Sequence, residues 1–143
     1  MKTFPEQSER CPVTAILRGI TPDEMIGVCE LLREAGIRLL EVPLNSPDAV
    51  ESIRRAAAKY HGGDELLVGA GTVLTPEAVR DVAAAGGKFI ISPDANPEVI
   101  RETKRLGLFS IPASSPRPRR SRRCGRGRTA SNSSPPERSA PAM

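Results

Sequence analysis

The stretch that decides the fold is LLVGAGTVLTPEAVRDVAAAGGKFIIS, residues 66–92. It opens with a near-continuous apolar run, passes through Thr75-Pro76-Glu77 into a segment with apolar residues three and four positions apart, and ends in a second apolar run. Unbroken apolar runs are typical of strands buried on both faces of a parallel sheet. Spacings of three and four indicate a helix. The stretch therefore predicts one strand–helix–strand unit.

The start signal of that helix occurs four times along the chain: TPDE at Thr21, SPDA at Ser46, TPEA at Thr75 and NPEV at Asn96. The first side chain can cap free N–H groups. Proline suits the first helical position, and an acid faces the positive end of the helix dipole. We therefore expect four helices. Glycines placed as C-terminal stops follow them: Gly36, Gly62, Gly86 and Gly107.

Each predicted helix has one apolar face. The faces comprise Met25, Val28, Cys29 and Leu32; Val50, Ile53, Ala57 and Tyr60; Val79, Val82 and Ala83; and Val99, Thr103 and Leu106. Apolar runs predicted as strands lie at residues 13–19, 38–44, 65–73, 89–92 and 108–112. This α/β order of about four and a half strand–helix units suits part of a TIM (β/α)8 barrel or an open doubly wound sheet. No G-x-G-x-x-G follows the first strand, which counts against a dinucleotide fold.

The charge divides the chain into two parts. Residues 1–112 carry 13 Lys and Arg against 16 Asp and Glu, whereas residues 113–143 carry eight Arg and one acid. Residues 113–143 contain no Leu, Ile, Val, Phe, Tyr or Trp. Such a segment has no apolar surface to offset the entropy of ordering, so we expect a disordered tail. Its arginines suit nucleic-acid phosphates, but it lacks the aromatic side chains that stack on bases.

Several classes of protein are disfavoured. No apolar run reaches the ~18 residues that a membrane span needs, and the polar N-terminus lacks the apolar core of a signal peptide. We therefore expect a cytoplasmic protein. Cys11, Cys29 and Cys124 have no metal-site or redox spacing, and His61 is the only histidine. No metal site is expected.

Polar residues at the ends of the predicted strands form the candidate site: Arg18, Glu41, Asn45, Thr72 and Pro93. A carboxylate in an apolar strand is costly to bury without a partner or a role. Glu41 is therefore either half of an ion pair with Arg18 or a general acid/base with a tuned pKa. The guanidinium of Arg18 suits a carboxylate or phosphate. Thr72 and Asn45 are open to two interpretations each, as turn residues or as ligand contacts.

Four motifs together resemble one family. They are AILRGITPDE (15–24), EVPLNSP (41–47), GAGTVLTPE (69–77) and ISPDANPEVI (91–100). They are similar to the 2-dehydro-3-deoxy-6-phosphogluconate / 6-phosphogalactonate aldolases, class I aldolases with a (β/α)8 barrel. The resemblance covers the chain from about residue 12 to residue 112. Pro43-Leu44-Asn45-Ser46 favours the phosphogalactonate branch over the gluconate and 4-hydroxy-2-oxoglutarate branch.

The resemblance implies cleavage of 2-dehydro-3-deoxy-6-phosphogalactonate to pyruvate and glyceraldehyde 3-phosphate through a lysine Schiff base. It implies that Glu41 shuttles protons and that Arg18 and Thr72 contact the pyruvyl carboxylate, with Asn45 and Pro93 also binding substrate. It implies a homotrimer with no cofactor, no metal, no nucleic acid and no membrane partner.

The chain departs from the family at its nucleophile. Its lysines are Lys2, Lys59, Lys88 and Lys104, and none lies inside a predicted strand. The resemblance places the lysine one helix beyond residue 112, in a Lys-Leu/Phe-Phe-Pro motif. Loss of one nucleotide after the Pro112 codon would permit a Thr-Pro-Thr-Glu helix start and then Lys-Leu-Phe-Pro in the shifted frame. We therefore expect residues 1–112 to be the N-terminal half of the barrel and residues 113–143 to be out-of-frame.

Two other hypotheses stay open. The body is a non-catalytic fragment whose basic tail binds nucleic acid, or it is another phosphate-binding barrel enzyme such as an isomerase. Five strands cannot close an eight-stranded barrel. The chain as written is therefore expected to be inactive, and poorly soluble or molten.

Overall fold

The computed structural model describes residues 2–61 and 65–113. Residues 114–143, predicted above to be disordered, lie outside this part of the chain, as does Gly62. The helices are α1 (Phe4–Arg10), α2 (Pro22–Glu34), α3 (Ala49–Lys59), α4 (Pro76–Ala84) and α5 (Pro97–Arg105). The strands are β1 (Thr14–Ile16), β2 (Leu39–Pro43), β3 (Leu67–Gly71), β4 (Phe89–Ser92) and β5 (Phe109–Pro112). No helix in the described residues is long and apolar enough to cross a membrane.

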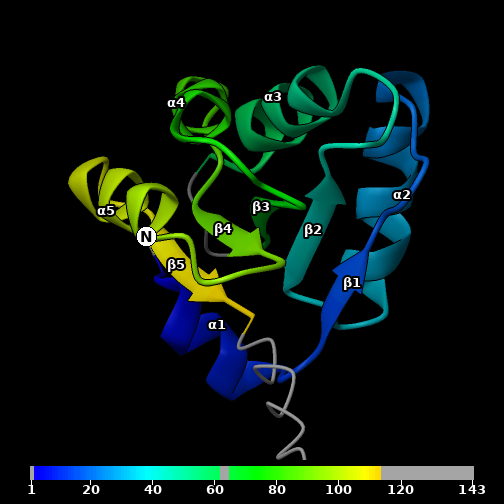
Figure 1. Ribbon diagram of the computed structural model, residues 1–143. Helices are drawn as coiled ribbons and strands as arrows, with labels where there is room; N and C mark the ends of the chain where they lie inside the picture. The colour runs from blue at the N-terminus through cyan, green and yellow to red at the C-terminus, as the bar shows by residue number, and fades with distance from the viewer. Residues whose placement is uncertain (1, 62–64, 114–143) are drawn as a thin grey trace, which may run out of the picture.

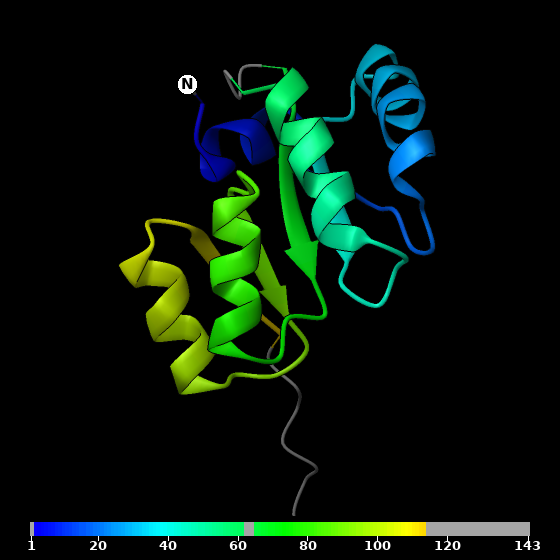
Figure 2. The same cartoon turned by 90° about the horizontal axis from the view of Figure 1, so that it is seen from above.

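The five strands form one parallel sheet in the order β1-β2-β3-β4-β5. Each strand lies beside its neighbour in the chain, so the order never reverses as it does in a doubly wound sheet. The strands fan around an arc, and α2 to α5 follow along its outer side (Figure 1). Seen from above, these helices lie side by side in chain order (Figure 2). The partial barrel is therefore confirmed over the doubly wound alternative.

The two faces of the sheet have separate cores. The outer core joins the strands to α2–α5, and its buried strand residues are Leu40, Val42, Val68, Ala70 and Ile90. Leu39, Leu67 and Phe89 alternate with these and form a second cluster on the inner face, together with Phe4. Every residue predicted to line an apolar helix face is buried or half-buried. Strands β2 and β3 are thus covered on both faces, as their unbroken apolar runs predict. The same prediction is wrong for the two outer strands, because no residue of β1 or β5 is buried.

Three of the four predicted helix starts are confirmed, because Thr21, Thr75 and Asn96 are the N-cap residues of α2, α4 and α5. The prediction for Ser46 is wrong. Helix α3 begins at Ala49, and its N-cap is Asp48, two residues after Ser46, in the left-handed region at φ 45°. The Ser46 hydroxyl instead accepts a hydrogen bond from the backbone N–H of Gly19, at 2.9 Å.

Helix α1 was not expected from the sequence. Its start is a capping box, in which the Glu6 carboxylate accepts hydrogen bonds from the backbone N–H and the hydroxyl of Thr3. The Phe4 ring stacks on Phe109, with centroids 4.7 Å apart, and meets Phe89 edge-on at 4.9 Å. Helix α1 therefore covers the inner face where the strands begin and leaves the end where they finish uncovered.

Candidate active site

The carboxyl ends of the strands lie along one edge of the sheet, and backbone hydrogen bonds between neighbouring strands fix their register there. The N–H of Leu17 donates to the carbonyl of Glu41 at 2.8 Å, and that of Leu44 donates to Gly71 at 2.9 Å. Further along, Val73 donates to Ile91 at 3.4 Å and Ala113 donates to Ser92 at 2.8 Å. The loops that follow β1, β2, β3 and β4 therefore share this edge. They hold Arg18, Asn45, Thr72 and Pro93.

Glu41 lies in the middle of β2, on the inner face, and is only 7% exposed. A Cβ built on Gly71 of the neighbouring strand would lie 1.6 Å from Oε1 of Glu41 and 2.5 Å from its Cδ. The carboxyl group therefore occupies the space that any side chain at position 71 would need. This space beside Gly71 is the seat of the Glu41 carboxyl.

The surroundings of Glu41 favour its protonated form. Burial raises the pKa of the Glu41 carboxyl, and the positive charge of Arg18 lowers it to a smaller extent. Between residues 2 and 61 and between 65 and 113, the carboxyl has no hydrogen bond and no ion pair. The ion pair with Arg18 considered from the sequence is not formed, and Arg18 itself is exposed. A buried carboxyl with a raised pKa and no fixed partner is a candidate for taking up and delivering protons.

Thr72 follows Gly71 directly and has φ 57°. Left-handed backbone is unusual for a β-branched residue, and such strained positions cluster at functional sites. Thr72 is half-buried, whereas Asn45 and Pro93 are exposed on the same edge. The structure thus brings all five predicted site residues to one end of the sheet.

Sequence reasoning missed two residues that support the site. Ser46, itself 7% exposed, links the loop of Arg18 to the loop of Asn45 through its hydrogen bond to Gly19. Gly71 has no side chain, and the space that a Cβ would take there is filled by the carboxyl of Glu41. A glycine on the strand next to a buried carboxylate is the signal that could have identified this seat.

None of the four lysines lies at this edge. Lys88 directly precedes β4, at the opposite end of the sheet, and Lys104 lies on α5. Lys59 ends α3 and forms an ion pair with Glu30. Lys2 precedes α1. Within the described residues, the edge therefore provides a buried carboxyl but no lysine amine.

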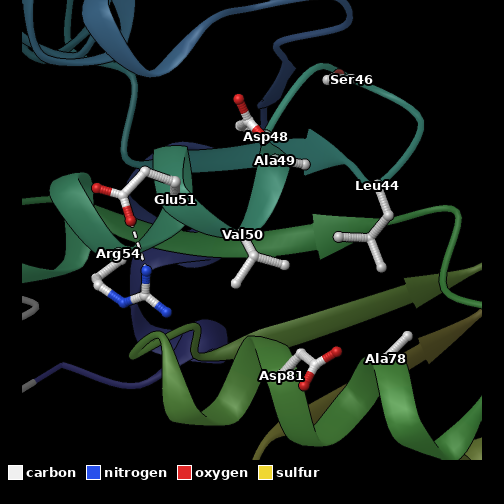
Figure 3. A pocket seen from close by; sticks show the side chains of 9 residues that line it. All are labelled: Leu44, Ser46, Asp48, Ala49, Val50, Glu51, Arg54, Ala78 and Asp81. Atoms are coloured by element: carbon white, nitrogen blue, oxygen red, sulfur yellow. Dashed lines mark hydrogen bonds and ion pairs between the residues drawn. The ribbon is translucent and has the colours of Figure 1, made fainter.

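A cavity of about 490 Å³ lies elsewhere, between α3 and α4 on the outer side of the sheet (Figure 3). Its lining comprises Leu44, Ser46, Asp48, Ala49, Val50, Glu51, Arg54, Ala78 and Asp81. Glu51 and Arg54 form an ion pair within it. Glu41 does not line this cavity, although Leu44 and Ser46 on either side of Asn45 do, so the cavity borders the loop after β2 from the outer side of the sheet. Within the described part of the chain, no three His, Cys, Asp or Glu side chains are grouped to hold a metal ion.

Comparison with known proteins gives consistent matches. Residues 6–116 match the family described as KDPG and KHG aldolase. A Rhizobium meliloti (strain 1021) protein named as a probable 2-dehydro-3-deoxy-6-phosphogalactonate aldolase is 44% identical over 101 residues, which are 71% of this chain and 47% of that protein. The 2-dehydro-3-deoxy-6-phosphogalactonate aldolase of Escherichia coli (strain K12) is 43% identical over 103 residues, covering 72% of this chain and 49% of that protein.

A solved structure is also similar. The KDPG aldolase of Legionella pneumophila, with pyruvate captured as a covalent carbinolamine, is 33% identical and superposes with a TM-score of 0.68. That match covers 78% of this chain and 53% of the Legionella protein. This chain thus spans about half the length of the relatives it matches.

Proposed function

Since the chain belongs to the KDPG and KHG aldolase family, we propose that residues 1–112 are the N-terminal half of a class I aldolase. The reaction is cleavage of 2-dehydro-3-deoxy-6-phosphogalactonate to pyruvate and glyceraldehyde 3-phosphate. The observation that carries this proposal is the buried Glu41 carboxyl, seated on Gly71 at the edge where the strands end.

The chemistry requires an amine and a proton shuttle. A lysine amine adds to the C2 carbonyl, and the carbinolamine loses water to give an iminium ion. Loss of the C4 hydroxyl proton then breaks the C3–C4 bond, and the electron pair moves into the iminium to form an enamine. Protonation at C3 and addition of water release pyruvate and the free amine. Each step moves a proton on the bound intermediate, and Glu41 is suited to this because burial raises the pKa of its carboxyl and so makes it a better proton acceptor when ionised.

The other four residues surround that proton shuttle. The exposed guanidinium of Arg18 is suited to the pyruvyl carboxylate, because its forked donors match the two carboxylate oxygens. Thr72 adds a hydroxyl from a strained turn beside Gly71. Asn45 and Pro93 extend the same edge and would contact the rest of the sugar acid. The hydrogen bond between Ser46 and Gly19 holds two of these loops together.

The nucleophilic lysine is the part that this chain lacks. The carbinolamine in the Legionella relative supports covalent capture of pyruvate in the family. We place the missing lysine in the part of the barrel that follows residue 112, and we interpret residues 113–143 as an out-of-frame reading of it. Sequencing the DNA around the Pro112 codon tests this. The interpretation is wrong if the shifted frame encodes no Lys-Leu-Phe-Pro or Lys-Phe-Phe-Pro motif.

The aldolase proposal is tested on a completed chain, defined as residues 1–112 fused to the part of the Escherichia coli relative that follows the matched segment. Pyruvate release is followed with lactate dehydrogenase and NADH. We expect release from 2-dehydro-3-deoxy-6-phosphogalactonate and slower release from the gluconate epimer, the alternative substrate. A borohydride-trapped pyruvate adduct should appear on the completed chain and not on the 143-residue chain. A folded completed chain that releases no pyruvate from either epimer refutes the proposal.

The family resemblance further suggests a homotrimer. Light scattering of the completed chain tests this assembly separately from the chemistry.

A further inference from the structure

We propose that Phe89 is a positioning residue for Glu41. Its ring fills the side-chain space over Gly69, so the Glu41 carboxyl is directed to the space over Gly71. Phe4 of α1 supports the ring from its other side, and the first helix thereby contributes to the site. The inference rests on the proposed function for what Glu41 does in the reaction, and on the packing of β2, β3 and β4 for where its carboxyl lies.

The inner face of β3 has two positions without a side chain of their own, Gly69 and Gly71. A Cβ built on Gly69 would lie 2.5 Å from both Cγ and Cδ2 of Phe89, so the ring fills the first space. A Cβ built on Gly71 would lie 1.6 Å from Oε1 of Glu41, so the carboxyl fills the second. The two neighbouring strands thus each place one side chain over β3.

The strand register puts both of these side chains beside the same glycine. Glu41 lies opposite Gly69 on one side, and the pairing of β3 with β4 places Phe89 beside Gly69 on the other. The space over a single glycine holds one of them. Because the ring takes it, the carboxyl extends along the strand to Gly71, toward the edge where the strands end.

The space over Gly69 leads away from that edge. Leu39 and Leu67, nearer the amino ends of their strands, are buried in the same inner cluster as Phe89. A carboxyl over Gly69 would lie among apolar side chains, at a distance from the loops that carry the other candidate residues. The position of the ring therefore decides whether the carboxyl faces the candidate site.

The Phe89 ring is itself held in place. Its side chain is fully buried, and the Phe4 ring meets it edge-on with centroids 4.9 Å apart. Phe4 in turn stacks on Phe109 at 4.7 Å. Edge-on and offset stacked arrangements are the favoured geometries of aromatic pairs. Helix α1 therefore presses the ring against β3, and this gives the helix a role in the site as well as in the cover of the inner face.

Few charges act on the Glu41 carboxyl. Arg18 lowers its pKa, against the larger effect of burial. Strands β1, β3 and β4, which flank Glu41 and Phe89, contain no titratable side chain between Thr14 and Ile16, Leu67 and Gly71, or Phe89 and Ser92. The charged residues of α1 are exposed: Glu6, Glu9 and Arg10.

Removal of the Phe89 ring should change the pKa of Glu41 in a defined direction. The vacated space is lined by apolar side chains, and such cavities stay free of water. The neutral carboxyl can enter it, whereas the ionised carboxylate is excluded by the cost of desolvation. The protonated form alone gains a second position, so the pKa of the Glu41 carboxyl should rise further.

The test compares Phe89→Ala with the parent in the completed chain. A ¹³C NMR titration of the Glu41 carboxyl carbon, assigned with Glu41→Gln, gives its pKa without any substrate. We expect a higher pKa in Phe89→Ala than in the parent. For pyruvate release kcat should fall by at least about tenfold, since the rate follows the fraction of molecules whose carboxyl lies over Gly71. KM should change less. Phe89→Leu keeps a side chain that reaches Gly69 and should retain the pKa and most of kcat.

Ile90→Ala is the matched control. Ile90 is the next residue of β4 and is fully buried, but it faces the outer core. Both truncations should lower the midpoint of urea unfolding, and Ile90→Ala should leave the pKa of Glu41 unchanged. Phe4→Ala removes only the support of the ring, from a half-buried position, and should raise the pKa of Glu41 by a smaller amount. If Phe89→Ala does not fold, Phe4→Ala carries the test.

The outcomes separate this inference from the proposed function. An unchanged or lowered pKa of Glu41 in Phe89→Ala, or an equal rise in Ile90→Ala, overturns the proposal. A raised pKa with an unchanged kcat also overturns it, because the carboxyl would then work equally well from either space. A folded parent that releases no pyruvate refutes the proposed function, while the NMR titration still decides whether Phe89 places the carboxyl.

Discussion

Gly71→Ala in the completed chain is the sharpest test of the site. The added methyl carbon would lie 1.6 Å from Oε1 of Glu41, 2.5 Å from Cδ and 2.9 Å from Cγ. Ordinary contact begins at 3.4 Å, so the carboxyl oxygen must move by roughly 1.8 Å. Gly71 does not have a positive φ, so its backbone accepts alanine and Glu41 is the group that is displaced.

A displacement of this size is large for a proton shuttle. A misplacement of about 1 Å can cost ~10²-fold in rate, so we expect kcat to fall by at least ~10²-fold, which corresponds to about 2.7 kcal/mol in the barrier. KM should change less, because the exposed residues that bind substrate are untouched. Steady-state pyruvate release gives both constants. The carboxyl pushed toward water should also regain a more ordinary pKa, which moves the acidic limb of the pH–rate profile to lower pH.

Gly27→Ala is the matched control. Gly27 lies on α2 with open space around the position of a Cβ, and alanine there should leave kcat unchanged and stabilise the helix by about 0.5–1 kcal/mol. If Gly71→Ala keeps kcat within threefold of the parent and leaves the pH profile unmoved, Glu41 does not need this seat and the assignment of its role is wrong.

Three further predictions concern single side chains. Glu41→Gln should lower kcat of the completed chain by ~10²–10⁴-fold. Because burial raises the folded-state pKa of Glu41, the parent protein loses stability as pH rises through that pKa. Urea unfolding should therefore show the variant to be the more stable protein at pH 7, and the difference in the free energy of unfolding should disappear below pH ~4. Ser46→Ala removes the hydrogen bond to Gly19 and should raise KM more than it lowers kcat, since the loop that carries Arg18 becomes more mobile. An unchanged KM would show that this loop keeps its conformation without the hydrogen bond. Hydrogen bonds from Arg105 and Arg80 lower the pKa of Glu102 to about 2. The stability from these ion pairs is therefore present above pH 4.5 and is lost as pH falls toward 2. In denaturant titrations, the free energy of unfolding of Glu102→Gln should fall less over this pH range than that of the parent protein.

Much of the fold can be predicted from the sequence because its signals are local. A capping side chain, a proline and an acid at Thr21, Thr75 and Asn96 act on the helix turn that follows them, and these helices begin as predicted. Ser46 carries the same local signal, yet its hydroxyl bonds to Gly19, 27 residues earlier in the chain. A contact between two loops depends on how strands pair, and no local pattern reports it. Helix α1 was missed for a simpler reason, since its proline follows Phe4 instead of the capping Thr3.

The five candidate residues could be predicted because strand ends in a parallel sheet share one edge. What could not be predicted is how Glu41 is held. The sequence leaves an ion pair with Arg18 and a general acid/base with a tuned pKa as alternatives, and the ion pair is not formed, since Arg18 is exposed. Glu41 lies opposite Gly69 in the strand register, and its carboxyl extends along the strand to Gly71. The seat is thus a property of two strands, and neither strand alone indicates it.

The same geometry explains why a chain with an intact acid/base edge should still be inactive alone. In the proposed mechanism Glu41 moves protons on an intermediate that is covalently held, and the described residues place no lysine amine at this edge. In the proposed whole barrel, the part that follows residue 112 would supply that amine and would also cover Ile16 on the inner face of β1, which is 56% exposed. Folding and catalysis therefore depend on the same missing strands. In the completed chain, Ile16→Asp would place a charge on the inner face of β1 and should lower both the midpoint of urea unfolding and the rate of pyruvate release, although Glu41 keeps its place beside Gly71. Unchanged unfolding and unchanged release would contradict this link between closure and catalysis.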